Sequence, residues 1–66
     1  MSNNALPERV HNLRKIKNLT QGELAKTSGV SQAYLSQIET GEANPTVATL
    51  QRIADALDVP ARELMR

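Results

Sequence analysis

The stretch LTQGELAKTSGVSQAYLSQIE, residues 19–39, contains two helix-start signals eleven residues apart. Thr20 stands three residues before Glu23, which is the spacing of a capping box, where each side chain accepts a hydrogen bond from the other residue's backbone N–H. Ser31 is a second residue suited to cap a helix N-terminus. Gly29, between the two, suits the left-handed conformation that ends many helices. The stretch therefore predicts two short helices joined by a sharp turn.

Apolar residues recur at helical spacing along the rest of the chain, and no strand-like alternation occurs. This periodicity predicts an all-α fold around one core. The five helices are expected at about 5–17, 20–29, 31–40, 46–57 and 61–65. With 66 residues the chain is long enough for one domain, which we place at 1–66 with its core at about 5–65.

Composition narrows the class of protein. The chain has no Cys, so neither disulfides nor thiolate metal sites stabilise it. No apolar run approaches the ~20 residues of a membrane span, and the first residues lack a signal-peptide profile, so we expect a soluble cytoplasmic protein. His11 has no carboxylate or thiol at ligand spacing and is interpreted as a surface residue. No catalytic nucleophile–base set or phosphate-binding glycine loop occurs, so we predict no enzyme activity, cofactor, metal or small-molecule ligand.

Charge is unevenly distributed, although the formal net charge is only +1. Residues 1–30 carry five basic and two acidic side chains, a net +3. Residues 31–66 carry three basic and five acidic side chains, a net −2. The positive half can face a polyanion, or it can be an ordinary solvated surface, and charge alone favours neither interpretation.

The turn between the two central helices is too short for an antiparallel hairpin and has the geometry of a helix-turn-helix. Such a corner needs a small residue where the helices cross, a turn residue that adopts positive φ, and apolar anchors on the second helix. The chain meets all of these needs, with Ala25, Gly29, Leu35 and Ile38.

Residues 19–57 closely resemble the λ-repressor/Cro-like (Xre-type) helix-turn-helix family, through the stretches LRKIKNLTQGELAKTSGVS, YLSQIETGEANP and TLQRIADALDVP. With the first helix included, the resemblance covers nearly the whole chain. It implies a five-helix λ-repressor-like DNA-binding domain that acts as a dimer at two-fold operators. Two residues depart from the family pattern. Gly22 replaces a better helix former, and Ile16 stands where the family is polar, either as a partner surface or as a scattered apolar residue.

The helix at 31–40 has two different faces. Leu35 and Ile38 fall on one face, and the other face carries Gln32, Ala33, Ser36, Gln37 and Thr40. Forked amides and hydroxyls match donor–acceptor pairs on base edges, and methyl groups match the thymine methyl. Lys and Arg instead add phosphate affinity that is independent of sequence. Such polar residues can also simply keep an exposed helix face in contact with water. On the second helix of this turn we favour base reading, by Gln32, Ala33, Ser36 and Gln37.

Other site residues surround this helix. By resemblance, Gln21 contacts a backbone phosphate and braces Gln32. The position supports the phosphate contact, because the free N–H groups at a helix N-terminus attract anions. Also by resemblance, Arg14 and Glu39 form a structural pair that ties the first helix to the end of the third. The remaining candidate phosphate contacts are Lys15, Lys17, Thr40, Asn44 and Thr46. The resemblance places the dimer interface at Val59, Pro60, Arg62 and Met65.

These features together predict a sequence-specific regulator of transcription that binds double-stranded DNA. We expect a repressor that reads the major groove with the helix at 31–40, as a homodimer on a two-fold operator. The rival interpretation is a protein-interaction module, such as an antitoxin-type partner-binding protein, that kept the fold with weak or no DNA binding. The low net charge and the lack of cations on the reading helix leave this alternative open.

Overall fold

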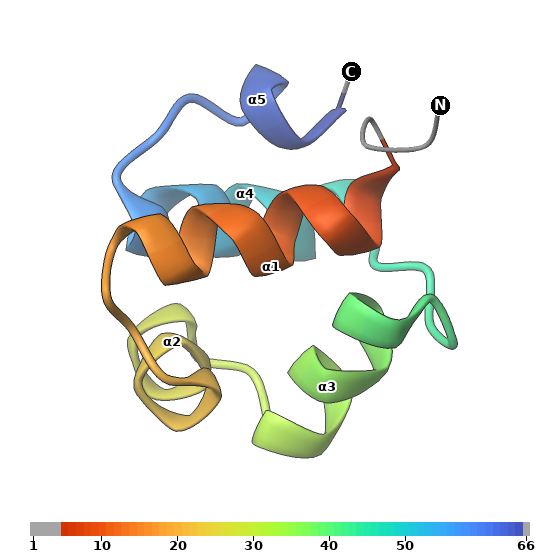
Figure 1. The fold of residues 1–66 in the computed structure, drawn as a ribbon. Helices are drawn as coiled ribbons and strands as arrows, with labels where there is room; N and C mark the ends of the chain where they lie inside the picture. The colour runs from red at the N-terminus through yellow and green to blue at the C-terminus, as the bar shows by residue number, and fades with distance from the viewer. Residues whose placement is uncertain (1–4, 66) are drawn as a thin grey trace.

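The computed structural model describes residues 5–65, which form five helices and no strand (Figure 1). Their bounds are α1 Leu6–Ile16, α2 Gln21–Ser28, α3 Gln32–Thr40, α4 Val47–Leu57 and α5 Arg62–Met65. The predicted all-α fold of five helices is therefore confirmed, and each bound lies within one or two residues of its expected position. Among residues 5–65, no helix is long and apolar enough to cross a membrane.

The helices pack so that α3 sits at one edge of the molecule. It contacts both α1 and α2, while α2 also contacts α4. The short helix α5 lies against α1 and α4, at the opposite end of the molecule from α3 in Figure 1. One side of α3 is therefore held by two other helices, and its other side is left for solvent or a partner.

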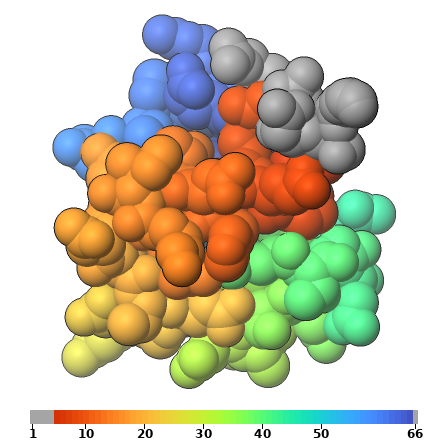
Figure 2. Space-filling model, viewed as in Figure 1, coloured from red at the N-terminus to blue at the C-terminus, as the bar shows by residue number. Residues whose placement is uncertain are grey.

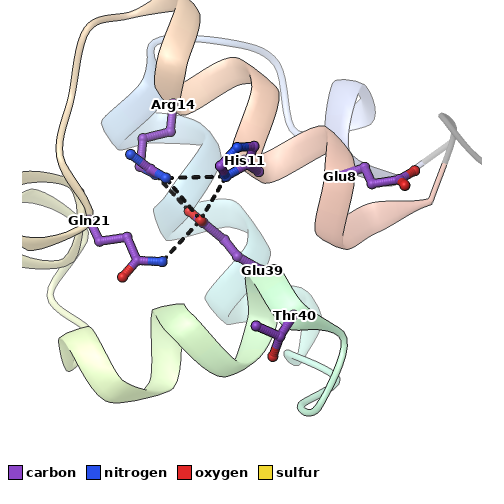
Figure 3. Close-up of a pocket in the computed structure, with 6 residues that line it drawn as sticks. All are labelled: Glu8, His11, Arg14, Gln21, Glu39 and Thr40. Carbon is purple, nitrogen blue, oxygen red and sulfur yellow. Dashed lines mark hydrogen bonds and ion pairs between the residues drawn. The ribbon is translucent and has the colours of Figure 1, made fainter.

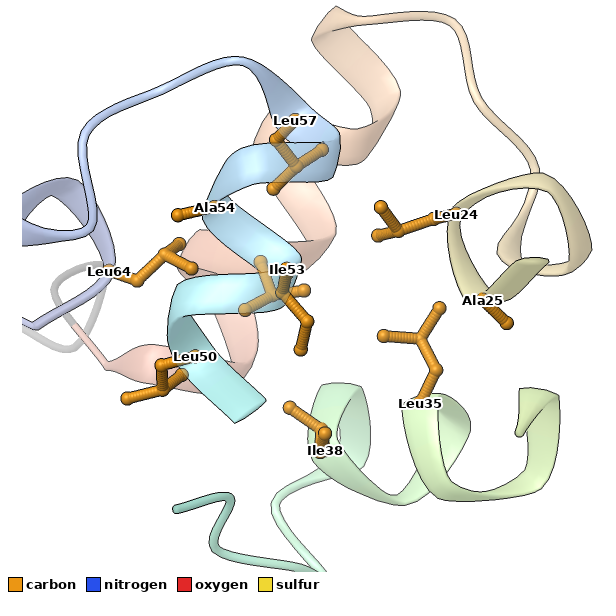
Figure 4. Packing of buried hydrophobic residues seen from close by; sticks show 10 residues of the cluster. Leu24, Ala25, Leu35, Ile38, Leu50, Ile53, Ala54, Leu57 and Leu64 are labelled. Carbon is orange, nitrogen blue, oxygen red and sulfur yellow. The ribbon is translucent and has the colours of Figure 1, made fainter. Parts of the chain in front are cut away.

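One aliphatic core holds these helices together, and every helix contributes to it (Figure 4). Ile53 of α4 lies in the centre of Figure 4, between the side chains of α2, α3 and α5. The core residues are Val10, Leu24, Ala25, Leu35, Ile38, Leu50, Ile53, Ala54, Leu57 and Leu64. Full burial of a Leu or Ile side chain stabilises a fold by about 1.5–3 kcal/mol, so this aliphatic core is the main source of stability in a chain with one aromatic residue and no cysteine.

Side-chain caps start three of the helices. In the capping box of α2, the Glu23 backbone N–H donates to Thr20 Oγ1 at 3.0 Å, and the Thr20 backbone N–H donates to Glu23 Oε1 at 2.8 Å. Ser31 caps α3 by accepting from the Tyr34 backbone N–H at 3.0 Å. Thr46 caps α4 in the same way. These contacts confirm the helix starts that the sequence predicted.

The turn from α2 to α3 depends on Gly29, which adopts φ of 79°. Its backbone N–H and that of Val30 both donate to the carbonyl oxygen of Ala25, at 2.9 and 3.1 Å, and so close the end of α2. Ala25 is 3% exposed, and its small side chain lets α3 pack close to α2. The chain therefore changes direction within three residues, as the sequence predicted, and this corner fixes where α3 begins.

Candidate nucleic-acid interface

The two faces of α3 differ as the sequence predicted. Leu35 and Ile38 are fully buried in the core. On the outward face, Ser36 is partly exposed, and the exposed residues are Gln32, Ala33, Gln37 and Thr40. In Figure 2, α2 and α3 together form the lower part of the molecular surface. The face thus presents amides, hydroxyls and a methyl group to the outside.

The outward face of α3 carries no charged side chain. The one ionisable acid of the helix, Glu39, turns toward α1, and its side chain is only 4% exposed. The structure thereby separates two tasks on a nine-residue helix. The charged group holds the helix in place, and the uncharged polar groups remain available to a partner.

Glu39 is the centre of a hydrogen-bond network that joins three helices (Figure 3). Arg14 donates to both carboxylate oxygens, from Nε to Oε2 at 2.8 Å and from Nη2 to Oε1 at 3.1 Å. Gln21 Nε2 donates to Oε1 at 3.1 Å. A further bond runs from Arg14 Nη1 to the carbonyl oxygen of Leu19, at 2.8 Å. The network therefore fixes the end of α3 to α1, to the start of α2 and to the loop between them.

The sequence did not predict that His11 joins this network. Its Nδ1 lies 3.2 Å from Glu39 Oε1 and 3.2 Å from Arg14 Nη2. Because an arginine nitrogen only donates, Nδ1 either donates to Glu39 or accepts from Arg14, according to the tautomer. The available signal was the spacing of His11 and Arg14, three residues apart on one helix face. The His11 side chain is 46% exposed, as expected of a surface histidine. Its contacts with Glu39 and Arg14 were not expected.

The network also sets the charge state of Glu39. Burial raises the pKa of this carboxyl, but hydrogen bonds from Arg14, Gln21 and His11 together outweigh burial and hold the pKa below its ordinary value. Glu39 is therefore ionised at neutral pH and accepts every bond that reaches it. The network lines an open pocket of about 400 Å³, together with Glu8 and Thr40.

The structure places the Gln21 side chain differently from the resemblance. The expected brace between Gln21 and Gln32 is replaced by the bond from Gln21 to Glu39. The Gln32 amide instead lies beside Gly22, where a Cβ atom would be 3.5 Å from Gln32 Oε1. Gln21 keeps the second N–H of its amide for another acceptor.

The other candidate phosphate contacts border α3 and the start of α2. Lys15 and Gln21 line an open depression between α1 and α2, and Lys17 is exposed in the loop that joins these helices. Asn44 is exposed in the loop after α3. Thr40 donates its hydroxyl to the carbonyl oxygen of Gln37, at 3.2 Å. The remaining candidate, Thr46, donates its hydroxyl hydrogen to Thr49 Oγ1 at 3.1 Å. Thr40 and Thr46 must therefore each break a hydrogen bond within the protein before the hydroxyl can donate to a phosphate.

The residues expected at a dimer interface lie around α5. Pro60 and Arg62 are exposed, Met65 is 47% exposed, and Val59 packs partly against the core. Two other large apolar side chains are exposed elsewhere, Ile16 at 71% and Val47 at 67%. No set of three or more His, Asp or Glu within residues 5–65 is arranged to hold a metal ion.

A family model described as helix-turn-helix matches residues 10–64. The chain belongs to this helix-turn-helix family. The match takes in the whole of α2, the turn and α3, the elements whose geometry is given above. The resemblance that the sequence analysis found in residues 19–57 is thereby confirmed.

Relatives of the helix-turn-helix chain are named as regulators of transcription. An HTH-type transcriptional regulator of Sinorhizobium fredii, y4dJ, is 53% identical over 53 residues, 80% of this chain and 69% of that protein. SutR of Escherichia coli, also an HTH-type transcriptional regulator, is 50% identical over 73% of this chain but only 27% of its own length. The CTXphi transcriptional repressor RstR of Vibrio cholerae is 41% identical over 89% of this chain and 53% of that protein. The chain thus spans about a quarter to two thirds of these proteins.

Two solved structures extend the comparison to the fold. The restriction–modification controller protein C.AhdI of Aeromonas hydrophila superposes with a TM-score of 0.88 at 36% identity, over 89% of both chains. SinR, the master regulator for biofilm formation, has been solved in complex with DNA and superposes with a TM-score of 0.88 at 34% identity. That match covers 92% of this chain and 98% of the SinR chain. Both solved structures thus share the fold of this chain over about nine tenths of its length.

The burial of the Glu39 network leads to a prediction about stability. Because the Arg14 and Glu39 side chains are 11% and 4% exposed, we expect Arg14→Met to lower the free energy of unfolding by ~3–5 kcal/mol, since a buried carboxylate loses its cation. Replacing both partners, as Arg14→Met with Glu39→Leu, should recover much of this loss. Urea denaturation followed by circular dichroism measures each variant.

The matched control is Asp55→Asn on α4, where an exposed carboxylate accepts one hydrogen bond from Gln51. This change should alter the free energy of unfolding by no more than about 0.5 kcal/mol. An Arg14→Met variant as stable as the Asp55→Asn control would contradict a structural role for the pair. If Arg14→Met is unfolded in buffer, the comparison is made in the presence of a stabilising osmolyte.

The lowered pKa of Glu39 leads to a prediction about pH. Because its pKa is lower in the folded state than in the unfolded chain, its stabilising contribution is complete above the unfolded pKa and is lost as the pH falls through the folded pKa. The free energy of unfolding of the native chain should therefore fall more steeply below about pH 4.5 than that of Glu39→Gln. Denaturation curves from pH 7 to pH 3 test this, and parallel curves for the two proteins would refute it.

Proposed function

We propose that the chain is a sequence-specific regulator of transcription that binds double-stranded DNA and acts as a repressor. The observation that carries the proposal is the division of α3 into a buried apolar face and an exposed uncharged polar face on the second helix of a helix-turn-helix. Leu35 and Ile38 anchor the helix, while Gln32 and Gln37 are exposed. The names of RstR, a transcriptional repressor, and of the SinR–DNA complex support the same function.

The exposed side chains of α3 have the chemistry that direct readout needs. In this docking mode the first turn of the recognition helix contacts base edges in the major groove, and Gln32 is the first residue of α3. A glutamine amide can pair with N6 and N7 of adenine at once. Gln37 lies on the same face, with Ala33 for a thymine methyl and Ser36 for a hydrogen bond.

Phosphate contacts would hold α3 in the groove. The N-terminus of α2 offers backbone N–H groups and a favourable dipole, and Gln21 at this end keeps one amide N–H. Lys15 lines the depression at the start of α2, and Lys17 is exposed in the loop between α1 and α2, so both can add positive charge near this end. The last three candidates lie in or next to the loop after α3, where their side chains can reach phosphates of the DNA backbone. They are Thr40, Asn44 and Thr46.

We also propose that the repressor binds as a homodimer through the region of α5. One domain of this size covers a single half-site, which gives too little contact for tight specific binding. The Cα atoms span 30 × 23 × 22 Å, so one copy cannot reach two major grooves ~34 Å apart and a second copy is needed for the second half-site. The proposed contact consists of Val59, Pro60, Arg62 and Met65, of which the last three are exposed.

The readers are tested on a duplex selected from a random library. Gln32→Ala should relax the preference at one base pair in each half-site, by the ~1–3 kcal/mol of a lost bidentate pair, and should leave the salt dependence of binding nearly unchanged. Gln37→Ala should act at a different base pair. Competition between duplexes that differ at single positions measures both. If both variants fold and keep the native affinity and base preference, α3 is not the reader.

The matched control for the readers is a change in a phosphate contact. Lys15→Ala or Lys17→Ala should weaken binding to all duplexes alike and reduce the slope of log affinity against log salt by about one. A base-specific effect of either lysine would contradict its assignment. A library from which no duplex is enriched would overturn DNA recognition and favour the protein-interaction alternative.

The proposed dimer predicts that Arg62→Glu or Met65→Glu weakens binding to a full two-fold site and leaves binding to an isolated half-site unchanged. Each change adds an acidic group at the proposed contact in both protomers, where residues 31–66 already carry a net −2 charge, and so opposes pairing without touching α3. Arg52→Glu on the exposed side of α4 is the control for Arg62→Glu, with the same change of charge. Gel-shift titrations on both duplexes measure the effect. One protomer that binds a half-site at full affinity would contradict the dimer.

A further inference from the structure

Gly22, in the first turn of α2, is the residue in the helix-turn-helix whose identity the fold does not explain. Its backbone is not in the left-handed region, which among the described glycines holds only Gly29 and Gly41. A Cβ atom at this position would lie 3.5 Å from its nearest neighbour, an ordinary contact distance. Alanine would therefore fit here and would favour the helix. The missing side chain needs another reason.

The neighbours of Gly22 supply that reason. The positions closest to its absent Cβ are Oε1 and Cδ of Gln32, at 3.5 and 3.9 Å, and Oγ1 of Thr20, at 3.9 Å. Thr20 is fixed by the capping box, because its hydroxyl accepts the Glu23 backbone N–H at 3.0 Å. The Gln32 side chain has no such restraint from the core, since it is exposed. A side chain longer than a methyl group at residue 22 would therefore displace the Gln32 amide.

We propose that Gly22 is a specificity-determining position. A residue no larger than alanine at this position lets the Gln32 amide rest on the first turn of α2, so that the amide is ordered before DNA arrives. A glutamine side chain has three rotatable bonds, and ordering them in advance lowers the entropy cost of forming a two-bond contact with a base. The inference rests on the proposed function, because it requires Gln32 to read a base. It adds that α2 sets how Gln32 is presented.

The test compares Gly22→Ala with Gly22→Leu. Alanine and leucine are both good helix formers, so both changes should stabilise α2, but only leucine reaches the Gln32 amide. Each is made in the native chain and in Gln32→Ala. The readout is the base preference at the pair that Gln32→Ala identifies, and the pair assigned to Gln37 is the internal control. Thermal unfolding of each variant checks that it is folded.

Gly22→Ala should keep the native base preference. Gly22→Leu should lower the preference at the Gln32 base pair by fivefold or more, should leave the Gln37 pair unchanged, and should have no further effect in Gln32→Ala. In the free protein, NMR should detect a nuclear Overhauser effect between the Gln32 side-chain amide and the Hα atoms of Gly22.

A folded Gly22→Leu that keeps the native preference, or that lowers it equally at both base pairs, would overturn the inference. Absence of the nuclear Overhauser effect would do the same. If Gln32→Ala itself changes no base preference, base reading by Gln32 fails and the inference fails with it. If Gln32→Ala relaxes one base pair and Gly22→Leu does not, only the inference fails and the proposed function stands.

Discussion

The buried carboxylate of Glu39 is the contact on which the placement of α3 depends. The helix is held at its start by the turn at Gly29 and near its end by the bonds that Glu39 accepts from Arg14 and Gln21. A helix of nine residues has little stability of its own, so two fixed ends and two buried apolar side chains largely determine its orientation. The charge at residue 39, turned inward, therefore fixes the orientation of α3 and leaves its outward face uncharged.

The sequence predicted those parts of the fold that depend on neighbouring residues. The caps at Thr20, Ser31 and Thr46 and the turn at Gly29 all follow from residues within four positions of one another, and the structure contains each. Asp58, which ends α4 in the left-handed conformation with φ of 60°, was not predicted. Aspartate adopts this conformation less readily than glycine does. No glycine follows Leu57, so the sequence does not indicate that the helix ends in this way.

The hydrogen-bond network around Glu39 was predicted only in part, because it depends on residues that are far apart in the sequence. The pair of Arg14 and Glu39 came from the family resemblance, not from local spacing. His11 and Gln21 reach the same carboxylate from positions 28 and 18 residues away in the chain, so their contacts exist only once α1, α2 and α3 have packed. Sequence periodicity predicts which face of a helix a residue lies on. It does not predict which of several polar groups on the neighbouring helices becomes its hydrogen-bond partner.

Stability and recognition share residues in a chain this small. The core has about ten side chains, and the elements that orient α3 are also those that hold the domain together. A change at Glu39 or Gly29 is therefore expected to alter both the fold and the outward face of α3. Residues such as Gln32 and Gly22 differ because neither contributes a side chain to the core. Under the proposed function, specificity could therefore change at these two positions at little cost in stability. A small domain can in this way keep one fold and still recognise different sequences.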